Sequence, residues 1–160
     1  MTDGHFYFLK DQYFADFKDP YLAQNRSSSD GCLHDRPCFC AFRDTVTGLY
    51  WMVPCSSQIS KFQSIYQKKV QRMGHCETID FGEILGHRKA FLLQNMCPAT
   101  DVYVKNEYLD PISGLPVRLD GVFEKRLIQN TKKVLALYRK GVKLIFPDVL
   151  KIEAELLGNR

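Results

Sequence analysis

Apolar and polar positions in the first third of the chain read mostly as β-strands. The stretch "HFYFLK" predicts a short aromatic strand, and the polar residues from Asp16 to Gly31 predict a long loop. The segment "PCFCAFRDTVTGLYWMVP" predicts two strands around a turn at Thr45–Gly48. In the first of these strands, alternation places Cys38, Cys40 and Phe42 on one face and Phe39 and Ala41 on the other.

A helical period follows Pro54. The segment "SSQISKFQSIYQKKVQRMG" carries apolar residues at helical intervals and ends at Gly74, which predicts a helix of about four turns. A second, longer helix is predicted from Gly121 to Lys140, closing at Gly141. Pro147 opens a last predicted helix, "PDVLKIEAELLG".

Between the helices, strands are predicted in "CETIDF", "RKAFLLQNMCP" and "DVYVKNEYL", and a turn in "DPISGLP". The pattern indicates an α+β fold: a strongly bent antiparallel sheet, one helix inserted after the third strand, and further helices packed on it from the C-terminal end. We expect residues 1–160 to form one domain.

Composition narrows the class of protein. Of 160 residues, 45% are hydrophobic and 25% are charged, and no apolar run approaches the ~18 residues of a membrane span. The N-terminal residues lack the pattern of a secretory signal, so we expect a cytoplasmic protein. The six cysteines at positions 32, 38, 40, 55, 76 and 97 are therefore expected to be reduced.

The net charge of +4 is unevenly distributed. Residues 1–50 carry seven acidic and five basic side chains, whereas residues 51–160 carry eleven and seventeen. One group of basic residues lies between Pro54 and Cys76, in a segment without any carboxylate. A second group lies on the long predicted helix. They comprise Lys61, Lys68, Lys69 and Arg72, and then Lys125, Arg126, Lys132, Lys133, Arg139, Lys140 and Lys143. Both groups predict a polyanion-binding surface, although solvated helix faces would look the same.

The junction between strand and helix carries Ser56, Ser57 and Lys61. With the strand ending at Pro54, the two serines are the expected N-cap residues, and Lys61 follows Ser57 by one helical turn. Hydroxyl, helix-start amides and ammonium can then converge on one phosphate. The plain alternative is a capped helix with a surface lysine.

Three stretches of the chain resemble a known family. They are "FYFLKDQYFADFKD", "RPCFCAFRDTVTGLYWMVPCSSQISKF" and "RKAFLLQNMCPAT". Together they resemble the endoribonuclease toxins of type III toxin–antitoxin systems, the ToxN/AbiQ family, and most closely its CptN/TenpN branch. The resemblance implies an SH3-like barrel of the MazF and Kid kind, and RNA cleavage without a metal or cofactor. It also implies inhibition by a small structured antitoxin RNA that the toxin processes from a repetitive precursor.

The resemblance also implies site residues. Ser56 and Ser57 match the family's pair of active-site hydroxyls, and Tyr13 matches an N-terminal tyrosine. ToxN-like members have their lysine two residues after the second hydroxyl, whereas here that place is Ile59 and Lys61 comes later. A second expected tyrosine has no counterpart, so His34 or Arg36 is the candidate for its place.

The expected reaction needs no metal because RNA carries its own nucleophile, the 2′-OH. Lys61 would stabilise the phosphorane, Ser57 and helix-start amides would bind its nonbridging oxygens, and Tyr13 and His34 are candidates for proton transfer. The products would be a 2′,3′-cyclic phosphate and a 5′-OH. RNA binding is expected from Arg36, Lys68, Lys69 and Arg72 and from Lys125, Arg126, Lys132 and Lys133. The resemblance further implies an assembly in which one RNA spans two toxin protomers, and a role in phage defence or locus maintenance.

Four other interpretations compete with these. Cys32, His34, Cys38 and Cys40 could bind zinc, but their spacing favours core packing. Ser57 and Lys61 could form a hydrolase dyad, although the Ser-x-x-x-Lys spacing is unusual for one. His75 and His87 are expected to be structural, and Trp51 is expected in the core. Finally, the protein could bind structured RNA without cutting it.

Overall fold

The computed structural model describes residues 1–27 and 33–158, which form short and long helices around a β-sheet. The strands are β1 (Phe6–Leu9), β2 (Arg26–Ser27), β3 (Leu33–His34), β4 (Pro37–Arg43), β5 (Tyr50–Ser56), β6 (Ile79–Ile84), β7 (His87–Leu92), β8 (Cys97–Ala99) and β9 (Val104–Glu107). The helices are α1 (Asp11–Asp16), α2 (Ile59–Met73), α3 (Gly121–Arg139) and α4 (Val149–Gly158), with single 3₁₀ turns η1 (Leu93–Asn95) and η2 (Asp101–Tyr103).

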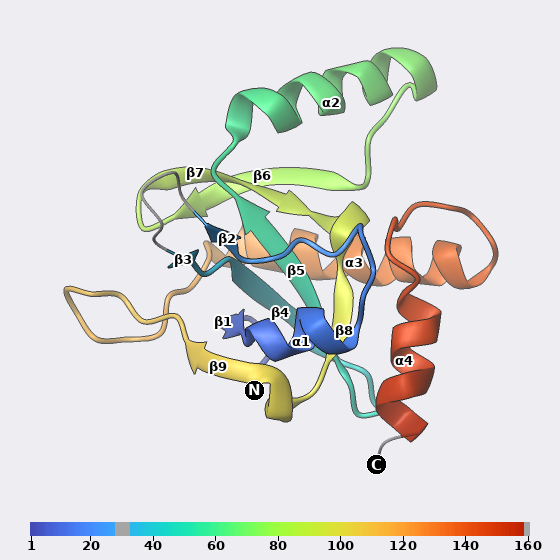
Figure 1. Ribbon diagram of the computed structural model, residues 1–160. Helices are drawn as coiled ribbons and strands as arrows, with labels where there is room; N and C mark the ends of the chain where they lie inside the picture. The colour runs from blue at the N-terminus through green and yellow to red at the C-terminus, as the bar shows by residue number, and fades with distance from the viewer. Residues whose placement is uncertain (28–32, 159–160) are drawn as a thin grey trace.

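Strand β5 is the centre of an antiparallel sheet with the order β6-β7-β5-β4-β1-β9. One edge of β5 pairs with β4. The other edge pairs first with β8, through Met52, and then with β7, from Cys55 onward. Pro54 lies at this change of partner, where a residue without an N–H leaves no ladder donor unpaired. The sheet therefore divides at β5 into two parts (Figure 1).

The sheet confirms the predicted α+β class. In the described part of the chain, however, the pairing runs as an open path from β6 to β9. The expected SH3-like barrel of the MazF and Kid kind is therefore not confirmed. No helix within residues 1–27 and 33–158 has both the length and the apolar character needed to cross a membrane.

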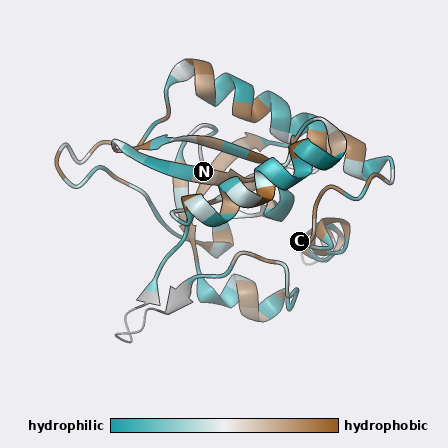
Figure 2. Cartoon of the chain, turned by 90° about the horizontal axis from the view of Figure 1, so that it is seen from above, coloured by the Kyte–Doolittle hydropathy of each residue, from teal (hydrophilic) through white to brown (hydrophobic). Residues whose placement is uncertain are grey.

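Three apolar clusters hold the helices on this sheet. Helix α3 covers one face, where Leu127 joins a cluster containing Phe39, Trp51 and Phe91. Helices α1 and α4 contribute Tyr13 and Ile152 to a second cluster. Helix α2 packs through Phe62, with Ile79, Ala90 and Leu92, against the β6–β7 hairpin, and lies at the top of Figure 1. Viewed from above, the helices carry both hydrophilic and hydrophobic turns, as expected of elements with one buried face (Figure 2).

Several predicted elements are confirmed. The β4–β5 hairpin closes within Asp44–Leu49, and α2 ends at Gly74, which adopts the left-handed conformation that favours glycine (φ 79°). Helix α3 begins after Asp120, whose carboxylate accepts hydrogen bonds from the N–H groups of Val122 and Phe123. Trp51 is fully buried, as predicted.

Other predictions are wrong in detail. Residues 11–16 form a helix that the sequence pattern does not predict, because Tyr13 and Phe17 pack with Tyr103, which is distant in the sequence. Strand β5 does not end at Pro54 but continues to Ser56, since β7 supplies a partner for it. The predicted strand at residues 88–98 is broken by η1 into β7 and β8.

The face of Phe42 was also predicted wrongly. The register of β4 shifts between Cys40 and Phe42, where Cys40 lies opposite Met52 and Phe42 lies opposite Trp51. This bulge turns Phe42 away from the side of Cys38 and Cys40 and onto the side covered by α3.

The buried thiols make a prediction about alkaline stability. Burial raises the pKa of Cys40 to about 12 and of Cys97 to about 11, and it also raises the pKa of Cys38 and Cys55. Unfolded cysteines lose their protons from about pH 8.5, so the folded state then holds more protons than the unfolded state. We therefore expect the free energy of unfolding to be constant with respect to these thiols below about pH 8 and to fall as pH rises toward 11–12. Each thiol contributes about 1.4 kcal/mol per pH unit.

The measurement is urea unfolding under reducing conditions at pH 8, 9 and 10. Lys69 opposes the trend by at most one proton, because burial lowers its pKa. The four thiols outnumber it, so the net slope stays negative. Cys97→Ala removes one titrating group and should make the slope less steep by about 1.4 kcal/mol per pH unit. A flat profile in the parent protein would contradict the prediction.

Candidate functional site

A small cavity lies where β5 ends, just before α2 begins. Cys55, Ser56 and Ser57 form one wall, and the segment His34–Pro37 forms the other. The volume is about 100 Å³, which corresponds to about three water molecules at liquid density. This space suits one small polar group rather than a whole nucleotide. The structure thus brings Ser56 and Ser57 together with His34 and Arg36, as the sequence had suggested.

The two serines do not cap α2 as predicted. The N-cap residue is Gln58, whose side chain makes no capping hydrogen bond. The Ser56 hydroxyl, which is buried, instead accepts a hydrogen bond from the Gln58 N–H at 3.2 Å. Ser57 is exposed, and its carbonyl accepts from the Ile59 N–H at 2.9 Å. Ser56 therefore shapes the strand-to-helix turn, while Ser57 lines the cavity as an exposed residue.

Arg36 ties the two walls of the cavity together. Its Nη1 donates to the Cys55 carbonyl at 2.8 Å, one residue before Ser56. Pro37, next to Cys38 and so in register with Cys55, has no N–H to offer this carbonyl. The guanidinium therefore supplies the hydrogen bond that the ladder lacks.

Asn25 holds Arg36 in place. The Asn25 carbonyl oxygen accepts from the Arg36 N–H at 2.9 Å. The Asn25 amide donates to the Leu9 carbonyl at 3.1 Å and to Asp11 at 2.8 Å. The loop that carries one wall of the cavity is thus anchored to the end of β1 and the start of α1.

Arg36 and Lys89 bring positive charge close to the cavity. Burial raises the pKa of the Cys55 thiol, and the charges of Arg36 and Lys89 act in the opposite direction. Lys89 precedes Ala90, which lies opposite Ser56. The Lys89 ammonium has no hydrogen-bond or ion-pair partner in the described part of the chain. Asp35, the carboxylate among the described residues of the wall, pairs with Lys105 at 2.7 Å. Lys89 was missed in the sequence, because only the register of β7 with β5 places it here.

Lys61 lies in the first turn of α2, but it does not line the cavity wall. Its ammonium is exposed and lies 5.5 Å from the centroid of the Phe62 ring. No ion pair holds Lys61 to another described residue. The side chain can therefore reorient toward an anion bound near the start of the helix.

Tyr13 is not part of this site. It is completely buried among Phe14, Phe17 and Tyr103, and its hydroxyl donates to the Pro98 carbonyl at 2.7 Å. Burial raises its pKa well above the ordinary value. The structure corrects the expectation of a catalytic role: Tyr13 anchors α1 to the sheet, so it cannot reach a substrate or exchange protons with one.

The basic residues of α2 do not all face solvent. Lys68 and Arg72 are exposed, as an RNA-binding role requires. Lys69 instead points inward, where its ammonium donates to Thr78 at 2.7 Å and to Gln94 at 2.8 Å, and burial lowers its pKa. Lys69 therefore links α2 to the sheet, and the structure does not support its expected contact with RNA.

The basic residues of α3 fall into two groups. Arg126 pairs with Asp80, and Lys133 pairs with Glu77. Lys125 and Lys132 are exposed, and no acidic partner for them occurs among residues 1–27 and 33–158. The four predicted RNA-binding residues of this helix are thus unequal in the positive charge that they can offer.

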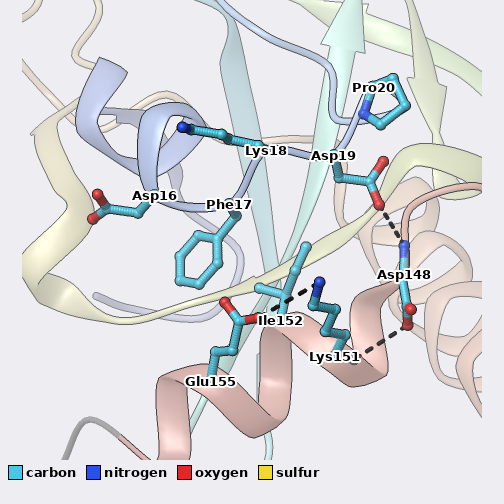
Figure 3. Close-up of a pocket in the computed structure, with 9 residues that line it drawn as sticks. All are labelled: Asp16, Phe17, Lys18, Asp19, Pro20, Asp148, Lys151, Ile152 and Glu155. Atoms are coloured by element: carbon cyan, nitrogen blue, oxygen red, sulfur yellow. Dashed lines mark hydrogen bonds and ion pairs between the residues drawn. The ribbon is translucent and has the colours of Figure 1, made fainter.

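A larger cavity, of about 520 Å³, lies between the loop after α1 and the start of α4 (Figure 3). Four carboxylates and two lysines are among the residues lining it: Asp16, Asp19, Asp148, Glu155, Lys18 and Lys151. The excess of negative charge would repel a polyanion. The smaller, positively surrounded cavity is therefore the candidate site, despite its size.

The competing interpretations can be compared with the same structure. Cys38 and Cys40 are buried in the apolar cluster around Tyr13, which confirms their predicted packing. Cys32 lies outside the described residues. The imidazoles of His75 and His87 are exposed and make no hydrogen bond within the described part of the chain. The prediction that these side chains are structural is therefore wrong.

Comparison with known proteins finds a similar fold but no sequence match. No family model and no curated protein matches the chain. A search of solved structures, by contrast, finds the same α+β fold in an RNA-cleaving protein. That protein is AbiQ, a lactococcal anti-phage endoribonuclease belonging to the type III toxin–antitoxin system. The two chains align over 98% of each with a TM-score of 0.68 and 13% sequence identity, so they share a fold.

The anchor at Asn25 yields a prediction about stability. Asn25→Ala removes three hydrogen bonds and leaves the part-buried N–H of Arg36 without its acceptor. We expect a loss of about 1–3 kcal/mol in the free energy of unfolding. Asn106→Ala is the matched control, because among the described residues the Asn106 amide donates only to the adjacent Glu107 carbonyl, on an exposed edge. That change should stay within about 0.5 kcal/mol. Equal losses in urea unfolding would show that Asn25 is no anchor.

Proposed function

We propose that the protein is an endoribonuclease toxin of a type III toxin–antitoxin system, closest to the CptN/TenpN branch. One observation carries the proposal: the cavity with Ser56 and Ser57 lies at the β5–α2 junction of a fold shared with AbiQ over 98% of both chains. The resemblance in the amino-acid sequence supports the same assignment independently of the fold.

The reaction is an intramolecular attack. The 2′-oxygen of RNA forms a bond to the adjacent phosphorus while the bond from phosphorus to the 5′-oxygen breaks. The 2′-OH gives its proton to a base, and the leaving 5′-oxygen takes a proton from an acid. The products are a 2′,3′-cyclic phosphate and a 5′-OH. Because the nucleophile belongs to the substrate, alignment and charge stabilisation are the main tasks of the protein, and a metal is not required.

The cavity and its surroundings offer groups for these tasks. The exposed Ser57 hydroxyl and the first-turn amides of α2 donate to nonbridging oxygens, with the dipole of α2 favouring negative charge there. Lys61 turns from the Phe62 ring to the phosphorane. Ser56 is a positioning residue, since its hydroxyl is already used by the Gln58 N–H. His34 is the proposed proton-transfer group, which its exposure in the opposite wall supports.

RNA would also be the partner that controls the protein. A small structured RNA, a pseudoknot processed from tandem repeats, binds the basic surface and leaves its cut end at the cavity. One such RNA spans two toxin protomers, which gives a closed assembly. The proposed setting is the cytoplasm, and the proposed role is phage defence by abortive infection or maintenance of the locus.

The decisive test is incubation of the purified protein with mixed RNA in EDTA. Cleavage that leaves 2′,3′-cyclic phosphate and 5′-OH ends, identified by their response to phosphatase and kinase treatment, is the expected result. RNA that is bound but remains intact would instead establish the alternative, a module that binds structured RNA. Cleavage that EDTA abolishes would overturn the metal-independent chemistry.

Substitutions at the junction test the roles of its residues. Lys61→Met keeps the helix-forming stem and removes the charge, so we expect cleavage to fall by about 10²–10³ while folding is retained. Ser57→Ala should also lower the cleavage rate strongly. Lys151→Met is the matched control, because Lys151 is 72% exposed on α4 beside the acidic cavity and should leave the rate unchanged.

Lys89 provides the internal comparison. If Lys61→Met cleaves normally and Lys89→Met does not, the phosphorane is stabilised from β7 rather than from α2. Full activity of both Lys61→Met and Ser57→Ala would contradict the assignment of the junction. The rate is measured on a labelled RNA, and growth of cells that express each variant without the antitoxin RNA gives the second readout.

A further inference from the structure

Two exposed cations, Lys132 of α3 and Lys140 at its C-cap, line a groove that the proposed reaction does not use. Lys125 and Lys132 are seven residues apart, and Lys140 follows eight residues later. These separations correspond to about 10 and 12 Å along the helix axis. All three are exposed, and none has an acidic or hydrogen-bonding side-chain partner in the described part of the chain. Their charges are therefore available to a ligand.

The neighbouring cations of the same helix are not available in this way. Arg126 donates to both oxygens of Asp80, at 3.1 and 3.3 Å, and Lys133 is paired with Glu77. Asp80 lies in β6 and Glu77 lies just before it, so these pairs bind α3 to the sheet. Lys132 and Lys133 are adjacent, but only Lys133 has an acidic partner among the described residues.

The groove has an apolar wall as well as cations. It measures about 390 Å³ and is lined by Phe42, Leu135 and Ala136 together with Lys132 and Lys140. Phe42 reaches this side only because the bulge in β4 reverses its face. The ring is partly exposed, and the Lys132 ammonium lies 5.2 Å from its centroid. A planar ligand can take the place of this ammonium on the ring while Lys132 turns to a phosphate.

The acidic residue at the rim does not cancel the positive charge. Asp44 accepts from the N–H groups of Val46 and Thr47 and lies 3.5 Å from Arg139, which also pairs with Glu153 at 2.8 Å. Burial alone would raise the Asp44 pKa, but these hydrogen bonds and the guanidinium lower it, so the carboxylate stays ionised and paired. With Lys132, Arg139 and Lys140 against Asp44, the lining of the groove keeps an excess of positive charge even though Arg139 is shared with Glu153.

We propose that this groove binds one unpaired nucleotide of single-stranded RNA, with its base stacked on Phe42 and its flanking phosphates on Lys132 and Lys140. Lys125 then meets the strand one step farther along α3. A site of 390 Å³ lies within the range of small-ligand pockets, and stacking on an aromatic ring accepts any base. The choice of RNA as the polyanion rests on the proposed function.

The groove is distinct from the candidate active site. Pro37 lines the small cavity and Phe42 lines the groove, and they are five residues apart on β4, or about 16 Å. An RNA strand that occupied both the groove and the small cavity would be held in the groove at a distance from the scissile phosphate. Occupancy of the groove thus adds grip on the RNA without touching the reacting atoms.

The test uses a fluorescein-labelled, unstructured 12-nucleotide RNA with 2′-O-methyl groups throughout, which lacks the nucleophile and cannot be cut. Fluorescence anisotropy gives Kd over a range of salt concentrations. Lys132→Gln should weaken binding about fivefold or more and reduce the log–log salt slope by about 0.7. Lys133→Gln removes the same charge from the next residue and should change Kd by less than about twofold.

Phe42→Leu tests the base contact separately. We expect Kd to rise about tenfold with the salt slope unchanged, because a stacking contact is lost and no phosphate contact. Inorganic polyphosphate, which has no base, should compete at Lys132 with equal strength in the parent and in Phe42→Leu. Thermal unfolding of each variant checks the fold, and Lys132 is exposed, so its variant remains informative if Phe42→Leu is unstable.

The outcomes separate this inference from the proposed function. Equal effects of Lys132→Gln and Lys133→Gln, or no effect of Phe42→Leu, would overturn the groove even if the protein cuts RNA. Binding that depends on Lys132 and Phe42 would establish the groove even if no RNA is cut in EDTA.

Discussion

The change of partner along β5 is the constraint on which the rest of the structure depends. A central strand must satisfy both of its edges, and β5 does so with three strands rather than two. Pro54 makes this division possible because it lacks the N–H that would otherwise need a partner at the change. The two halves of β5 can then belong to two parts of the sheet, one covered by α1 and α4 and the other supporting α2.

The candidate site is a consequence of the same division. Past Pro54 the strand has only Cys55 and Ser56 left before the chain turns into α2, so the Ser56–Ser57 pair lies at the end of the sheet. On the other side of β5, the strand β4 has only just begun, with a proline. The Cys55 carbonyl therefore takes its hydrogen bond from the Arg36 side chain. A gap in the ladder is thus filled by a cation, which is why a cavity with positive surroundings forms there.

Elements with strong local signals could be predicted from the sequence, and elements created by distant contacts could not. Helix α2 has an apolar period and a left-handed glycine at its end, and the hairpin of β4 and β5 has β-prone residues around a turn. By contrast, α1 depends on packing with Tyr103, which lies about ninety residues away along the chain. The bulge that reverses Phe42 leaves no mark in the alternation, because "CFCAF" fits a regular strand equally well.

The same distinction between local signals and distant contacts holds for the candidate site. Its location at Ser56 and Ser57, and the presence of His34 and Arg36 opposite them, could be inferred from the sequence. The burial of Tyr13 could not, since a tyrosine near a strand end reads alike whether it faces solvent or core. Nor could the position of Gln58 as the N-cap residue, because the extra length of β5 comes from pairing with β7. Lys89 was missed for the same reason: its position beside Ser56 is a matter of register alone.

Ion pairing finally explains why a basic composition says little about where a polyanion binds. On α3, Arg126 and Lys133 are held by Asp80 and Glu77, so their charges stabilise the contact of the helix with the sheet. On α2, the ammonium of Lys69 is similarly held by Thr78 and Gln94. The cations that stay unpaired are those that the carboxylates and amides of the sheet cannot reach. Lys125, Lys132 and Lys140 lie beyond that reach, and their charges are therefore left for a ligand.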